Sequence, residues 1–101
     1  STPTPSAPSI HSKTLFNLAL VLQESGDLAQ AADLYMGILR SDPGQAEARL
    51  NLCNILYSQQ HQGTERCYLD VLRVRPGYVR AVVNLAAMYG GREGEGEGWE
   101  R

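Results

Sequence analysis

The sequence repeats itself with a period of about 33 residues, a size typical of stacked supersecondary units rather than of a globule built around one core. Asn51-Leu52-Cys53 has one counterpart a period earlier, Asn17-Leu18-Ala19, and another a period later, Asn84-Leu85-Ala86. Further pairs are separated by the same period: Tyr35 and Tyr68, Leu39 and Leu72, and Pro43 and Pro76. The repeat therefore favours a short stack of similar units.

Apolar residues within each unit recur at helical spacing. Leu15, Leu18, Ala19 and Leu22 follow the i, i+3, i+4, i+7 pattern that places them on one face of an α-helix. Four further helices are expected to bury Leu28, Ala31, Tyr35, Ile38 and Leu39; Leu52, Cys53 and Leu56; Tyr68, Val71 and Leu72; and Val82, Leu85, Ala86 and Tyr89. The sequence therefore predicts an all-α fold of five helices.

Short polar turns are predicted between the helices. Gly26 ends the first helix because glycine can adopt the left-handed conformation, and Asp27 with Gln30 forms a capping box for the second. By the same logic Asp42 is predicted to cap the third helix, with Gln45 completing its box.

Composition changes at both ends of the chain. Residues 1–11 are rich in Pro, Ser and Thr and are predicted to be a disordered leader. Residues 91–101 alternate Gly with Glu and are predicted to be a disordered tail. The repeat domain is expected to span 12–90, with repeat one at 12–45, repeat two at 46–78 and a half repeat at 79–90.

The charges exclude several classes of function. Residues 10–90 hold seven basic and seven acidic side chains, whereas phosphate binding needs a sustained basic surface, so nucleic acid is not expected as a partner. No apolar run approaches the ~18 residues of a membrane span, so no membrane insertion is expected. His11 and His61 lack the partners that catalysis needs. We expect neither an enzyme nor a metal or cofactor.

The two cysteines, Cys53 and Cys67, lack the C-x-x-C or His-rich spacing of metal and redox sites. We expect them to be reduced, small apolar residues in a chain with a cytoplasmic or nuclear location. A disulfide or a metal site is the minor alternative.

When the units are aligned with one another, they resemble the tetratricopeptide repeat, whose pattern is W-x2-L-G-x2-Y, then A-x3-F, then P. The matching residues are Leu15, Leu18, Ala19, Leu22, Ala31, Tyr35 and Pro43; Arg49, Leu52, Cys53, Leu56, Thr64, Tyr68 and Pro76; and Val82, Leu85, Ala86 and Tyr89. The resemblance implies antiparallel helix-turn-helix repeats stacked as a short right-handed solenoid. Arg49, Thr64 and a shortened turn at 58–63 depart from the pattern, so the second pair of helices is expected to be looser.

Function in this family, as the resemblance implies, is the binding of an extended or helical peptide in a concave groove lined by the first helices. Asn17, Asn51 and Asn84 are similar to the asparagine ladder of the superhelical repeats of O-linked N-acetylglucosamine transferase, which contacts the ligand backbone. The alternative is that each asparagine caps or braces a neighbouring helix. The neighbouring groove positions are Lys13, Phe16, Leu20, Glu47, Leu50, Asn54, Arg80 and Val83.

Two other functions are compatible with the sequence. The last helix has no partner helix after it, so the chain could self-associate through Val82, Leu85 and Tyr89. The family's carboxylate clamp, which holds the C-terminus of chaperone peptides, is only partly matched, because Leu20 replaces an expected asparagine. Its remaining residues here are Lys13, Asn51, Arg80 and Asn84.

Overall fold

Five α-helices make up the part of the chain that the computed structural model describes, residues 10–97. They are α1 Ile10–Glu24, α2 Leu28–Ser41, α3 Ala46–Ser58, α4 Thr64–Val74 and α5 Val79–Glu97. The predicted all-α fold of five helices is confirmed. Residues 1–9 of the predicted leader and residues 98–101 of the predicted tail lie outside the described residues.

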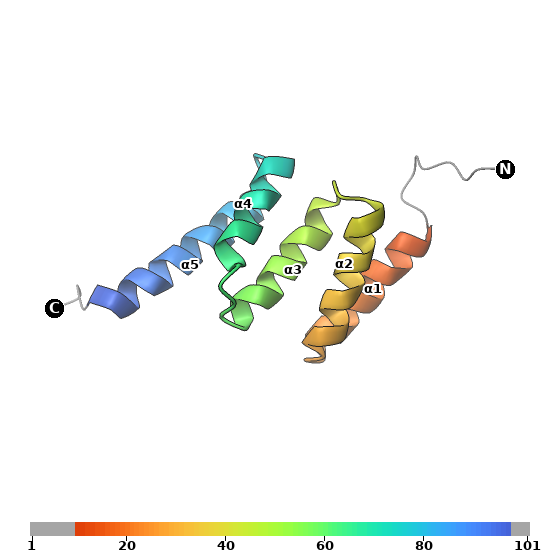
Figure 1. The fold of residues 1–101 in the computed structure, drawn as a ribbon, viewed down its shortest axis with the longest axis horizontal. Helices are drawn as coiled ribbons and strands as arrows, with labels where there is room; N and C mark the ends of the chain where they lie inside the picture. Colours follow the sequence, from red (N-terminus) through yellow and green to blue (C-terminus); the bar gives the residue numbers. More distant parts are fainter. Residues whose placement is uncertain (1–9, 98–101) are drawn as a thin grey trace.

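Each helix packs mainly against the helices next to it in sequence, and α3 also contacts α5. Figure 1 shows α1 and α2 at one end of the molecule, α3 in the middle, and α4 and α5 at the other end. Within residues 10–97, no helix is both long and apolar enough to cross a membrane.

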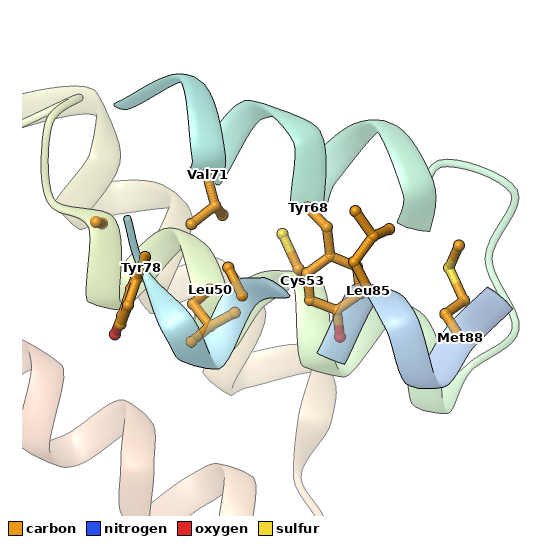
Figure 2. Close-up of a cluster of buried hydrophobic side chains, with 9 residues drawn as sticks. Leu50, Cys53, Tyr68, Val71, Tyr78, Leu85 and Met88 are labelled. Atoms are coloured by element: carbon orange, nitrogen blue, oxygen red, sulfur yellow. The ribbon is translucent and has the colours of Figure 1, made fainter. Parts of the chain in front are cut away.

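The buried apolar side chains form two clusters that meet at α3. The first joins α1, α2 and α3 through Ala19, Ala31, Tyr35, Ile38, Ala48 and Ile55. The second joins α3, α4 and α5 through Ala46, Leu50, Cys53, Tyr68, Val71, Tyr78, Ala81, Leu85 and Met88 (Figure 2). Helix α3 therefore buries side chains on both of its flanks.

The first turn forms as predicted, and the second does not. Gly26 has φ +93°, and the carboxylate of Asp27 accepts from the backbone N–H of Gln30 at 3.4 Å. Asp42, however, ends α2, where its N–H donates to the carbonyl of Ile38 at 2.9 Å. The cap of α3 is Gln45, whose side-chain oxygen accepts from the N–H of Ala48 at 3.2 Å, so α3 begins at Ala46.

Two helix limits also differ from the sequence prediction. Helix α1 begins at Ile10, inside the predicted leader, and α5 continues past Gly90 to Glu97. Residues 91–97, which were expected to belong to a disordered tail, are thus part of α5. Glycine disfavours a helix interior by about 1 kcal/mol, but extending an existing helix avoids the costly nucleation step.

The predicted buried faces of α1 and α5 were partly wrong. Leu18 and Val82 are each 47% exposed, and Ala86 is exposed as well. Among residues 79–90 of α5 the buried residues are Ala81, Leu85 and Met88, because this helix packs back onto α4 and α3.

Candidate protein-binding surface

A buried tyrosine links the first two repeat units through its hydroxyl group. Tyr35 of α2 lies in the first cluster, and its hydroxyl donates to Oε1 of Gln23 in α1 at 2.7 Å. The same hydroxyl accepts from Nδ2 of Asn51 in α3 at 3.2 Å. The rings of Phe16 and Tyr35 pack edge to face, with their centroids 5.8 Å apart. Tyr35 thereby ties three consecutive helices together.

Tyr68, one period later, takes part in a related bridge. Its hydroxyl donates to Oδ1 of Asn54 in α3 at 2.6 Å. Oδ1 of Asn54 also accepts from Nδ2 of Asn84 in α5 at 2.9 Å. Asn84 therefore joins α5 to the preceding pair α3–α4, just as Asn51 joins α3 to the preceding pair α1–α2.

Both tyrosines are protonated at neutral pH and can donate these bonds. Burial raises the pKa of Tyr68 to about 12, and repulsion between its phenolate and an ionised Tyr57 adds to the effect at high pH. Burial also raises the pKa of Tyr35, against the opposing effect of its bond from Asn51. The two hydroxyls therefore keep near pH 7 the protons that these bonds need.

The asparagines predicted to form a ligand ladder do not share one environment. Asn51 is only 6% exposed and bonded within the chain, and Asn84 is half-buried and bonded to Asn54. Asn17 is exposed on α1. In this conformation Asn51 and Asn84 brace neighbouring helices, which agrees with the alternative interpretation of the sequence.

The remaining predicted groove positions divide by burial. Leu50 is fully buried in the second cluster, so the expectation that it lines an open groove is wrong. Half-buried positions are Phe16, Leu20 and Asn54; exposed positions are Lys13, Glu47, Arg80 and Val83.

A charged row follows the first helices of the units. Lys13, Glu47 and Arg80 occupy equivalent positions of successive units, near the starts of α1, α3 and α5. Nη1 of Arg80 lies 3.7 Å from Oε2 of Glu47, and Asn84 bonds to Asn54 on the same two helices. The surfaces of α3 and α5 are therefore continuous along this row, which alternates positive, negative and positive.

Tyr78 supports the basic end of this row, and the sequence interpretation missed it. The guanidinium groups of Arg75 and Arg80 lie 4.3 Å and 6.0 Å from the centre of its ring. Such cation–π contacts hold arginine side chains in place. The sequence signal was an aromatic residue between two nearby arginines, Arg75 and Arg80.

Cys53 and Cys67 form a disulfide between α3 and α4, with Cα atoms 5.5 Å apart. The prediction of reduced cysteines is therefore wrong. The disulfide could not be predicted from the spacing of the two cysteines, because they face each other only when α3 and α4 pack as a hairpin. The bond also joins the two helices that were expected to form the looser pair. The predicted cytoplasmic location rested on reduced thiols and loses that support, since structural disulfides persist mainly in oxidising compartments.

The α3–α4 pair also accommodates its other departures from the repeat pattern. Thr64 is buried, and its hydroxyl donates to the carbonyl of His61 at 2.7 Å, closing the short turn. Nη2 of Arg49 donates to the carbonyl of Pro43 at 2.9 Å. Arg49 also lines an open hollow of about 400 Å³, together with Asp70, Arg73 and Val74. Arg73 pairs there with Asp70 at 3.3 Å.

The stripe predicted for self-association is mostly occupied within the chain. Leu85 is 8% exposed, and the hydroxyl of Tyr89 donates to Oε2 of Glu65. Only Val82 of the three predicted residues is open. The exposed apolar face of α5 instead consists of Val79, Val82 and Val83, at 68%, 47% and 56% exposure.

Comparison with known proteins gives no family assignment: no family model matches the chain, and no curated protein matches it. The repeat pattern and the contacts among the described helices are therefore the grounds for inferring function.

Proposed function

We propose that this chain is a tetratricopeptide-like protein-interaction module that binds an extended or helical peptide along the first helices α1, α3 and α5. The observation that carries the proposal is the charged row of Lys13, Glu47 and Arg80. The three exposed side chains stand at equivalent positions of successive units, where a single peptide running along the first helices would meet each in turn. The proposal includes a scaffold role and no catalytic chemistry.

The alternating row implies a ligand whose charges alternate in the opposite sense. An acidic residue of the ligand would meet Lys13, a basic one Glu47, and a second acidic one Arg80. The Arg80–Glu47 pair is about half exposed on both sides, so it contributes little to stability and can exchange for a ligand. The half-buried Phe16 and Leu20 would add apolar contact.

The carboxylate clamp receives less support from the contacts. Two of its four candidate residues, Asn51 and Asn84, already bond within the chain, and Arg80 pairs with Glu47. A clamp needs these groups to converge on one carboxylate.

A displayed peptide library selected on the full chain tests the proposal. We expect enriched peptides to carry alternating charges, and their affinity to fall about tenfold in the double variant Glu47→Arg/Arg80→Glu. This variant keeps an ion pair at the same place while reversing the pattern, so a loss of binding reports on the ligand. Arg66→Glu on the exposed side of α4 is the matched control and should bind normally. Failure to enrich any peptide, or equal binding by the charge-swapped variant, would refute the proposal.

Self-association is the second candidate function, because Val79, Val82 and Val83 expose an apolar face on α5. Burying such side chains stabilises association by about 25 cal/mol per Å² of apolar surface. We expect wild-type chain to increase in mass with concentration in light scattering and Val82→Asp to remain one chain. If light scattering gives the mass of a single chain at every wild-type concentration up to ~1 mM, self-association is excluded.

A further inference from the structure

One face of α1 is open although the same face is covered on the two later first helices. Subtracting one period from α3 places Asn17, Leu18 and Val21 at the positions of Asn51, Leu52 and Ile55. Adding one period gives Asn84, Leu85 and Met88 on α5. We call Asn17, Leu18 and Val21 the α1 end face.

Burial differs sharply among these equivalent positions. Ile55 and Met88 are 2% and 6% exposed, whereas Val21 is 60% exposed. Leu85 is 8% exposed and Leu52 is half-buried, whereas Leu18 is 47% exposed. The α1 end face is thus a copy of a packing surface that none of the described helices covers.

The covering helices on α3 and α5 share one pattern. Helix α2 packs on α3 with Ala31, Tyr35 and Ile38 in the first cluster, and α4 packs on α5 with Tyr68 and Val71 in the second, where Thr64 of α4 is also buried. The spacing is the same in both: a small residue, a tyrosine four residues later, and a β-branched residue three residues after that. On α3 the tyrosine hydroxyl accepts from the asparagine of the covered face at 3.2 Å.

We propose that the α1 end face binds an amphipathic helix of a partner protein, with a small residue, a tyrosine and a β-branched residue at this spacing. The tyrosine hydroxyl accepts from Nδ2 of Asn17, and the β-branched residue packs on Leu18 and Val21. This surface is distinct from the charged row, so the inference does not depend on the proposed peptide-binding function.

A second copy of the chain does not provide such a helix. Helix α2 is packed between α1 and α3, and α4 between α3 and α5, so both tyrosine-bearing helices are already covered on their two sides. The exposed valines on α5 of a second copy offer no hydroxyl. The proposed partner therefore contributes its own tyrosine-bearing helix.

The chain's own α2 sequence is the probe for this site. A synthetic peptide of residues 27–42 carries the pattern, and an Ala29→Lys change allows a lactam bridge to Asp33 that holds it helical. Both bridged positions are exposed on α2, so the bridge does not touch the packing face. The isotope-labelled full chain is titrated with this peptide and followed by NMR.

We expect saturable shifts centred on Asn17, Leu18 and Val21. Leu18→Asp should abolish them, whereas Val82→Asp, an equally exposed site on α5, should leave the affinity unchanged. Shifts centred on α5, or no shifts up to ~1 mM peptide, would overturn the proposal.

A double-mutant cycle tests the hydrogen bond itself. Asn17→Ala in the chain and Tyr35→Phe in the peptide should each weaken binding about 3- to 10-fold, the range of one net hydrogen bond. Together they should weaken it no more than either alone, because both remove the same contact. Additive losses would show that the two groups do not meet and would overturn the proposed register.

Discussion

Replacing Leu50 with alanine is expected to lower the free energy of unfolding by about 2–5 kcal/mol, the range for large-to-small changes in a packed core. Leu50 is fully buried between α3, α4 and α5 among Cys53, Tyr68 and Val71 (Figure 2). Small domains have about 5–15 kcal/mol of stability in total, so a large part of the population should unfold at moderate temperature. Chemical denaturation followed by circular dichroism measures the loss.

Leu52→Ala is the matched control, since it removes the same atoms from the same helix. Leu52 is only half-buried and packs at the edge of the first cluster, so its truncation should cost clearly less. The sequence pattern alone predicts the opposite order, with Leu52 inward and Leu50 on the groove wall. A larger loss for Leu52→Ala than for Leu50→Ala would contradict the packing described here.

Reduction of the Cys53–Cys67 disulfide should have an effect of similar size. The bond closes a loop with a sequence separation of 14 residues. A loop of that length is worth about 3 kcal/mol, because cross-linking limits the conformations of the unfolded chain. In a domain of this size such a loss lowers the melting temperature by about 12–24 °C. Thermal melts with and without dithiothreitol, a dithiol reductant, measure the shift.

The double variant Cys53→Ala/Cys67→Ala separates the bond from side effects of the reductant. It should melt near the temperature of the reduced wild type and should not respond to dithiothreitol. Identical melts of oxidised and reduced wild type, together with free thiols in the untreated chain, would support the reduced cysteines predicted from the sequence and contradict the disulfide.

Local features of the chain could be predicted because their causes lie close together in sequence. Gly26 permits the left-handed turn after α1, and Asp27 accepts from Gln30 only one helical turn away. The helical apolar spacing and the repeat identified Tyr35 and Tyr68 as buried residues, and both are fully buried.

The candidate site could be predicted only in part. The exposed row of Lys13, Glu47 and Arg80 follows from repeat positions and needs no knowledge of packing. The environments of Leu50 and Asn51 could not be predicted, because a central helix in this arrangement is covered on two flanks by different neighbours. A single apolar stripe describes only one of those contacts.

The sequence by itself determined the period, the five helices and the tyrosine-centred repeat, since each depends on residues within one unit. Only the tertiary structure decided which flank of each helix is covered, which asparagines bond within the chain, and that Cys53 meets Cys67. Those outcomes depend on the register between helices. Because no described helix precedes α1, the same Asn-Leu pattern that is covered on α3 and α5 is left open there.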